Sequence, residues 1–201
     1  MNATGSYRLG KRAIEQDRTR RRIVEAAEDL YLERWYDDVG LREVASGAGV
    51  ALQTVVNHFG SKGGLLVAVA ESVGGRIDRR RDDVAPGDVP GAVAMIVDEY
   101  EEIGDGIVRM IALEGRVEEL TPLLAQGRAV HRAWVERVFA QWLPESPGTE
   151  RERRTVALIA ATDVLTWKIL RREQDLRRDE AEATMRETVL ALIERSGAVG
   201  R

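Results

Sequence analysis

The stretch from residue 41 to residue 62 reads LREVASGAGVALQTVVNHFGSK. Its apolar residues predict two short helices, 41–46 and 52–59, joined by a turn, Gly47-Ala48-Gly49-Val50, whose glycines tolerate the positive φ that reversing the chain requires. The apolar side chains that can lock the two helices together are Leu41, Val44, Ala45, Val50, Val55 and Phe59. This pattern predicts a helix-turn-helix, whose second helix presents polar side chains to a major groove of DNA.

Helical spacing continues on both sides of this stretch. Apolar residues recur with it almost throughout, and alternating β-branched runs are scarce, so we expect an all-α fold of about nine helices. A helix over 17–34 precedes the helix-turn-helix, and Ser61 caps a linking helix over 62–81. The expected helices of the body cover residues 90–103, 106–119, 121–143, 150–173 and 179–195.

Charge is distributed unevenly along the chain, whose formal net charge is −4. Residues 1–24 carry seven Lys and Arg against two carboxylates, a net +5, so the remainder carries −9. A basic end and an acidic body are typical of a protein of which only one end meets phosphate. We therefore expect a flexible basic arm over 1–16, a DNA-binding head over 17–64, and a helical ligand-binding and dimerisation body over 65–201.

Composition argues against several kinds of site. The chain has no cysteine and only two histidines, His58 and His131, which lie far apart in sequence, so we expect no metal and no cofactor. No run approaches the roughly 18 apolar residues of a membrane span, and the N-terminus lacks the apolar core of a secretory signal. We expect a cytoplasmic protein with no membrane partner.

The helix-turn-helix and its flanks resemble the TetR (tetracycline-repressor-like) family of transcriptional regulators. The resemblance depends above all on Asn57-His58-Phe59-Gly60-Ser61-Lys62, where the linking helix opens. The other segments that carry it are Ile23 to Tyr31, Arg42 to Ala45, Ala48 to Val50 and Thr54-Val55. It implies a homodimeric regulator, which we expect to be a repressor that binds a palindromic operator in double-stranded DNA and is released by a small molecule.

The resemblance also assigns roles to individual side chains. Arg42 is expected to reach a base edge, since its guanidinium suits bidentate contact with guanine O6 and N7. The pair Gln53-Thr54, at the start of the recognition helix, is expected to read bases or nearby phosphates. The pair Asn57-His58 is expected to meet the sugar-phosphate backbone, and Lys62 adds charge to a helix N-terminus that already attracts phosphate.

Three positions depart from the family pattern. Ala51 stands where the family usually has a hydroxyl-bearing N-cap, a loss of roughly 0.5–2 kcal/mol of local stability. Val56 replaces an aromatic residue, usually Tyr, that would contact phosphate, and Leu52 has no hydrogen-bonding group. We expect Leu52 and Val56 on the DNA-facing side, which is therefore poorer in polar contacts than the family norm.

Residues 150–173 predict a helix that is apolar on nearly all sides between Val156 and Leu170. A helix without a polar face needs partners on two sides, and a second chain can supply one of them. Together with the last helix it would form a four-helix bundle about a two-fold axis, as the resemblance also implies. The residues expected at this interface are Val156, Ile159, Ala160, Val164, Met185, Val189 and Leu192.

The body is also expected to hold a small apolar or amphipathic effector. Apolar walls with a few polar groups suit such a molecule, although the same side chains are consistent with an ordinary core. The expected lining residues are Met95, Tyr100, Met110, Leu113, His131, Trp134, Asp163 and Trp167.

Two other functions stay open at this point. The missing aromatic at Val56 is compatible with a helical dimeric interaction or sensor protein that has weak or lost DNA binding. An enzyme would need acid-base groups such as His131 and Asp163, but the sequence shows no nucleophile motif, phosphate loop or metal spacing. We therefore expect a regulator and not an enzyme.

Overall fold

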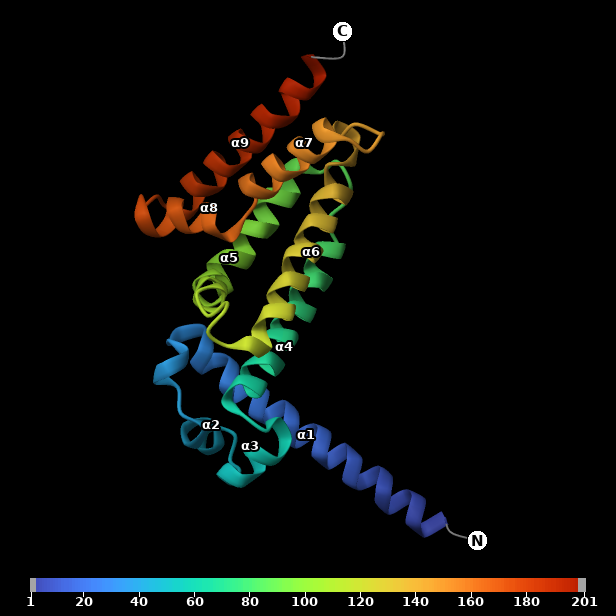
Figure 1. The fold of residues 1–201 in the computed structure, drawn as a ribbon, viewed down its shortest axis with the longest axis vertical. Helices are drawn as coiled ribbons and strands as arrows, with labels where there is room; N and C mark the ends of the chain where they lie inside the picture. The colour runs from blue at the N-terminus through green and yellow to red at the C-terminus, as the bar shows by residue number, and fades with distance from the viewer. Residues whose placement is uncertain (1–2, 199–201) are drawn as a thin grey trace.

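The computed structural model describes the backbone of residues 3–198 and the side chains of residues 11–194. Within these ranges every regular element is helical, as the sequence predicts. The N-terminal head is built from α1, α2 and α3, and α4 leads from it into the body (Figure 1). The bounds of these helices are Ala3–Glu33 for α1, Leu41–Gly47 for α2, Leu52–Phe59 for α3 and Lys62–Asp82 for α4.

The body consists of the remaining helices, with α7, α8 and α9 at the end far from the head (Figure 1). Their bounds are Val89–Ile111 for α5, Thr121–Val138 for α6, Thr149–Ala161 for α7, Val164–Lys168 for α8 and Arg178–Ala198 for α9. A π-helical turn, Ile169–Glu173, extends α8. Among the described residues no helix is long and apolar enough to cross a membrane.

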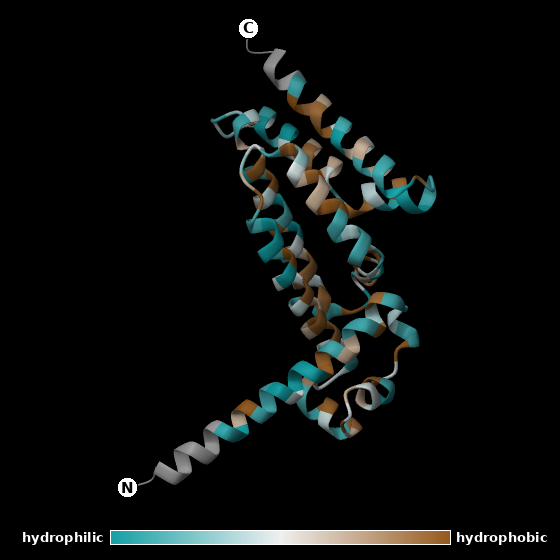
Figure 2. Cartoon of the chain, turned by 180° about the vertical axis from the view of Figure 1, so that it is seen from behind, coloured by the Kyte–Doolittle hydropathy of each residue, from teal (hydrophilic) through white to brown (hydrophobic). Residues whose placement is uncertain are grey.

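Two hydrophobic clusters form the core. The head cluster contains Ile23, Val44 and Val55, and it extends to Ile103 and Met110 near the C-terminal end of α5. The body cluster gathers buried side chains of α5, α6, α7, α8 and α9. Because α5 contributes to both, the head is packed directly onto the body, and Figure 2 shows apolar residues along the helices where they face one another.

Helix α1 begins earlier than the sequence predicts. Residues 3–16, expected to form a flexible arm before a helix start at Asp17, continue the helix back to Ala3. Arginine, lysine, alanine, glutamate and glutamine are good helix formers, and this segment contains no proline to stop them. Glu15 and Asp17 also pair with Arg18 and Arg21 one turn further on. Residues 1–2 of the expected arm lie outside the described residues.

Helix α5 is continuous where two helices were expected, 90–103 and 106–119, and it ends at Ile111, before the expected end at residue 119. Gly104 and Gly106, at the position of the expected break, are buried inside the helix. A Cβ on Gly104 would lie 2.6 Å from a ring carbon of Trp167, and one on Gly106 would meet the side chain of Leu32. These glycines therefore allow close helix packing and do not end the helix.

The helix expected over 150–173 is divided. It stops at Ala161 and restarts at Val164, because Asp163 accepts a hydrogen bond from the Leu165 amide at 2.8 Å and caps the new helix. Similarly, the segment 121–143 ends its α-helix at Val138 and continues as a 3-10 turn.

Candidate nucleic-acid interface

The turn between α2 and α3 joins them as a helix-turn-helix. Gly49 has a φ of 64°, a conformation that favours glycine, so the chain reverses there as predicted. The Val50 amide donates to the Ala45 carbonyl at 2.9 Å and closes the turn. Val44, Ala45 and Val55 are buried in one cluster, which confirms the predicted packing of the two helices.

The N-termini of α3 and α4 are capped differently. Ser61 Oγ accepts a hydrogen bond from the Gly64 amide at 2.8 Å, which confirms the predicted cap of α4. Ala51 occupies the same position before α3, with extended backbone, and its methyl group cannot accept from the first amides of the helix. The recognition helix therefore lacks one local source of stability.

We expect Ala51→Ser to raise the free energy of unfolding by roughly 0.5–2 kcal/mol, because the new hydroxyl can cap α3 as Ser61 caps α4. Urea unfolding followed by circular dichroism at fixed protein concentration measures the change. Ser61→Ala is the matched control and should lower stability by a similar amount. Identical unfolding midpoints for both variants and the parent chain would show that the caps are energetically irrelevant.

The side of α3 opposite Val55 presents polar groups to solvent. Gln53 and Asn57 are exposed and one turn apart, and Gln53 Nε2 donates to Asn57 Oδ1 at 2.9 Å. Thr54 and Val56 flank this pair and are half-buried. The structure therefore displays a polar edge with one aliphatic side chain on it, at the surface of the head.

The other DNA-facing candidates border this edge. Arg42 is exposed on α2. Leu52 is half-buried and packs against the head cluster, so it contributes to packing as well as to the surface. His58 is half-buried, and its ring centroid lies 6.0 Å from that of Phe59.

Lys62 has intramolecular partners at the start of α4. Its Nζ lies 4.3 Å from the centroid of the Tyr36 ring and donates to the Asp37 carbonyl at 3.4 Å. Partial burial lowers the pKa of Lys62, and the charges of Asp37 and Asp38 oppose this. Lys62 therefore holds the start of α4 against the 3-10 turn that follows α1. A bound phosphate would compete with this turn for the charge of Lys62.

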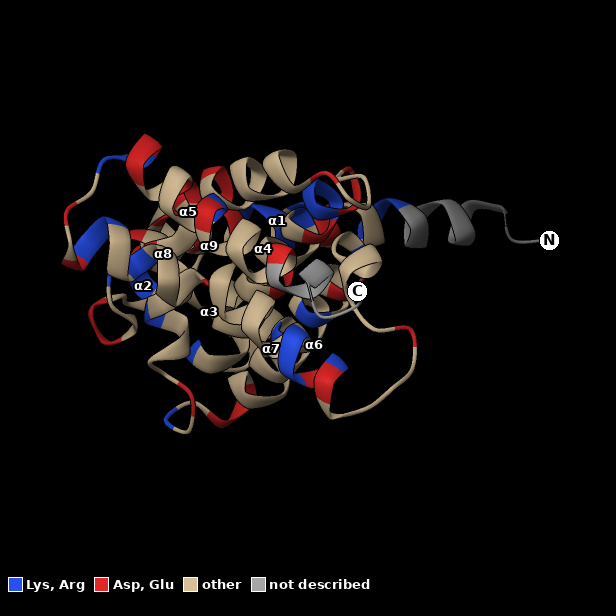
Figure 3. Ribbon diagram, turned by 90° about the horizontal axis from the view of Figure 1, so that it is seen from above, with Lys and Arg blue, Asp and Glu red and all other residues tan. Residues whose placement is uncertain are grey.

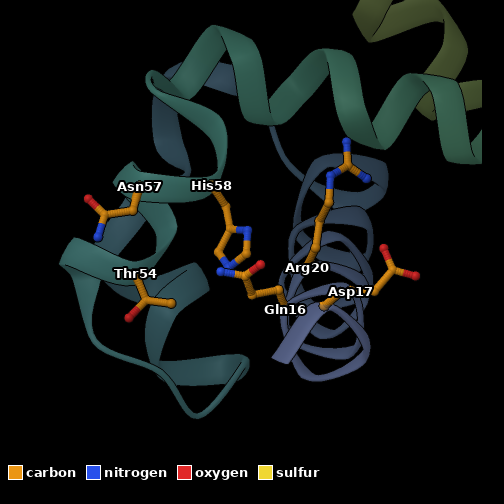
Figure 4. Close-up of a pocket in the computed structure, with 7 residues that line it drawn as sticks. Gln16, Asp17, Arg20, Thr54, Asn57 and His58 are labelled. Atoms are coloured by element: carbon orange, nitrogen blue, oxygen red, sulfur yellow. The ribbon is translucent and has the colours of Figure 1, made fainter. Parts of the chain in front are cut away.

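An open hollow of about 450 Å³ lies between α3 and α1 (Figure 4). Its lining residues are Thr54, Asn57 and His58 from α3 and Ala13, Gln16, Asp17 and Arg20 from α1. The side chains of His58 and Gln16 point toward each other across it. Sequence reasoning missed the contribution of α1, for which the positive charge of residues 1–24 was the available signal.

The side chains expected to line an effector pocket are divided between the two cores. Trp134 stacks on His131 with ring centroids 5.6 Å apart, and Tyr100 lies 6.0 Å from Trp167. The head cluster contains Met110 and Leu113, whereas the body cluster contains Tyr100, Trp134 and Trp167, with Met95 packed against it. The structure therefore does not bring the full expected set together.

His131 belongs to a buried polar network that joins α4, α5 and α6 to the turn after α7. Arg81, at the end of α4, donates to both carboxylate oxygens of Glu99 at 2.6 and 3.3 Å and to His131 Nδ1 at 3.0 Å. Because a guanidinium only donates, Nδ1 accepts and Nε2 carries the proton, which it donates to Thr162 Oγ1 at 3.1 Å. Sequence reasoning missed Arg81, Glu99 and Thr162, since the pattern along each helix gave no sign that they meet.

Burial and a neighbouring charge act together on the His131 imidazole. Burial lowers the pKa of His131 to about 3, and the charge of Arg81 acts in the same direction. The imidazole is therefore neutral at physiological pH. The two groups considered for acid-base chemistry both have structural partners, since Asp163 caps α8 and His131 is held by Arg81 and Thr162.

The structure separates the expected interface residues by exposure. Val164, Met185 and Val189 are buried within the protomer, where they pack in its own core. Val156 and Ala160 are exposed, and Ile159 and Leu192 are half-buried. The large hydrophobic side chains that these helices and the π-helical turn expose are Val156, Leu165, Ile169 and Leu190. The spacing of apolar residues predicted these helices but not which of their sides face outward. A helix that is apolar on all sides does not indicate which side packs against the core of its own protomer.

Residues 23–69, which span α1 from its first buried residue, the helix-turn-helix and the first part of α4, match the family model for bacterial regulatory proteins of the tetR family. No curated protein sequence matches the chain.

Solved structures extend the likeness to the body. A tetR-family transcriptional regulator from Streptomyces coelicolor superposes with a TM-score of 0.76 at 20% identity, over 91% of this chain and 83% of that one. A transcriptional regulator from Rhodococcus sp. Rha1 gives 0.72 at 18% identity, over 87% and 96%. The multidrug binding protein EbrR, solved with imidazole, gives 0.62 at 20% identity, over 86% and 88%. The chain has the fold of TetR-family transcriptional regulators.

Proposed function

We propose that this chain, a TetR-family regulator by its helix-turn-helix domain and its fold, is a repressor that binds an approximately palindromic duplex as a homodimer. The observation that carries the proposal is the exposed polar edge of α3, where Gln53 and Asn57 face outward with Arg42 nearby on α2. An edge of this kind on the second helix of a helix-turn-helix fits the major groove.

The side chains of this edge can be sorted by what they would contact. Arg42 suits a guanine, because its fork of donors matches O6 and N7. Gln53 and Asn57 can pair with base edges once their mutual hydrogen bond opens, and Val56 can contact a thymine methyl group. His58, beside the hollow, is placed to reach the sugar-phosphate backbone.

Dimerisation would follow from the apolar side chains that α7, α8, the π-helical turn and α9 expose. Val156, Leu165 and Ile169 are 50%, 45% and 46% exposed, and these exposed fractions are high for large apolar side chains on the surface of a monomer. An isologous contact through this side would bury them and place two heads for two half-sites about one DNA turn or slightly more apart.

Release by a small apolar or amphipathic effector is the remaining part of the proposal. Within the described part of the chain the Trp134 indole nitrogen is buried without an acceptor, next to the network of Arg81 and His131. An effector that accepts from Trp134 would compete for this network, whose Arg81 lies on α4, the helix that begins in the head with Lys62. Such a molecule shifts the head spacing only if it binds the two states with different affinity.

The experiment selects genomic fragments with the purified chain and then titrates the selected duplex and an unrelated one by fluorescence anisotropy at two salt concentrations. Binding should weaken steeply as salt rises, by counterion release. Recovery of no fragment, or binding that salt does not change, would favour an interaction or sensor protein instead.

Two single variants in this assay separate the assigned roles. Arg42→Ala should cost about 1–3 kcal/mol on the selected duplex and less on the unrelated one, because it removes a base contact. Lys62→Ala should weaken binding to both duplexes about equally and reduce the salt slope by about 1, because it removes a phosphate contact. Equal losses from both variants on both duplexes would refute these roles.

A further inference from the structure

Residues 11–22 of α1 bury no side chain against the described part of the protomer. Ile23 is the first buried side chain of the helix, and of residues 11–22 all but Thr19 are exposed. In Figure 1 this part of α1 projects beyond the head. Most of the surface of this segment is therefore open to solvent and accessible to another molecule.

This free segment is strongly basic. Residues 11–22 contain six Lys and Arg against Glu15 and Asp17, a net +4. The ion pairs that join Glu15 to Arg18 and Asp17 to Arg21 are long, 3.8 and 3.7 Å, and exposed, so they neutralise little charge. Figure 3 shows Lys and Arg, in blue, along the first part of α1 that is coloured by residue type. The cations of the segment that pair with no described acidic side chain include Lys11, Arg12 and Arg22.

The basic segment is continuous with the edge that the proposed function assigns to DNA. Arg20 and Gln16 line the hollow whose other wall carries Asn57 and His58 of α3 (Figure 4). Arg20 also lies over the Phe59 ring, 5.3 Å from its centroid, which holds α1 beside α3. A duplex that meets α3 therefore comes close to this part of α1 as well.

The direction of the segment decides which part of the duplex it would meet. In Figure 1, α1 extends from the head toward the side opposite α8, which carries the exposed Leu165 assigned to the proposed dimer contact. The helix from Ile23 back to Lys11 is about 18 Å long at 1.5 Å per residue. This length corresponds to about five base pairs at 3.4 Å each.

We propose that residues 11–22 bind the phosphate backbone of duplex DNA that flanks the operator on its outer side. This inference rests on the proposed function and adds to it a second, sequence-independent binding element. Charge complementarity favours DNA as the occupant, and an anionic membrane fits less well because Ile14 is the single large apolar side chain of the segment.

The test uses two duplexes, one that ends at the edges of the selected operator and one with about ten further base pairs on each side, which exceeds the reach of about five base pairs estimated from helix length. The parent chain should bind the longer duplex more tightly. The triple variant Lys11→Gln, Arg12→Gln, Arg18→Gln should lose this advantage while binding the shorter duplex as before. Its salt slope on the longer duplex should fall by about 0.9 for each phosphate that the variant no longer neutralises.

The control triple variant, Arg128→Gln, Arg153→Gln, Arg177→Gln, removes three exposed cations of the body and should bind both duplexes as the parent chain does. Equal affinity of the parent chain for the two duplexes would overturn the inference while leaving the proposed function intact. The inference would also be overturned if the Lys11→Gln, Arg12→Gln, Arg18→Gln variant bound both duplexes more weakly by the same factor. If the parent chain binds neither duplex, the proposed function fails and this inference fails with it.

Discussion

Replacing Leu165 and Ile169 together by glutamate is expected to convert the proposed dimer to a monomer and to lower its affinity for a palindromic duplex by roughly 10²–10⁴-fold, the usual gain from linking two binding events. Both side chains are nearly half exposed on the outward side of α8 and the turn that follows it. Across a two-fold axis the new carboxylates would meet their own copies and lose water without a partner.

Sedimentation velocity checks the first part of this result, since the mass should fall to that of a single 22.3 kDa chain. Circular dichroism should be unchanged, because neither side chain belongs to the core of the protomer. Trp35→Glu is the matched control, as Trp35 is 53% exposed on the head and should leave the mass unaffected. A double variant that stays dimeric would place the interface elsewhere on the molecule.

The second large effect concerns stability. Glu99→Ala should lower the free energy of unfolding by about 3–5 kcal/mol, because it leaves the Arg81 guanidinium buried without a counter-charge. The side chains of Arg81 and Glu99 are 8% and 0% exposed, so water cannot replace the lost partner. Urea unfolding at fixed protein concentration measures the loss, since the stability of the proposed dimer would depend on concentration.

Glu102→Ala provides the control on the same helix. Glu102 pairs with Arg80 at 2.6 Å, but it is 51% exposed, so its removal should cost less than about 1 kcal/mol. Arg81→Met in the Glu99→Ala background should recover part of the lost stability, because it removes the stranded charge. Similar losses from Glu99→Ala and Glu102→Ala would show that the network does not hold α4 to α5.

Local sequence signals predicted the helix-turn-helix well. The bounds of α3 were correct, and those of α2 and α4 were correct to within one residue. The chain reversal at Gly49 and the helix cap at Ser61 depend only on residues within one helical turn, so local sequence reveals them. The same reasoning was wrong at Gly104 and Gly106, where glycine serves close packing against Trp167 and Leu32. Those partners are distant in sequence, so no local pattern reveals them.

The candidate site shows the same limit. The outward position of Gln53 and Asn57 follows from the period of one short helix, and it was predicted. The hollow with Gln16 and Arg20 depends on how α1 crosses α3, which spacing along either helix cannot give. The burial of Met185 and Val189 depends likewise on which helices cover α9 in the folded protomer.

The central claim is that two chains present the α3 edge, residues 52–58, to a major groove. Guanine methylation interference on the selected duplex tests it most directly, because N7 methylation blocks the groove that this edge would enter. We expect two clusters of interfering guanines with centres about 10–10.5 base pairs, or slightly more, apart. Binding that no guanine N7 methylation disturbs would contradict the account.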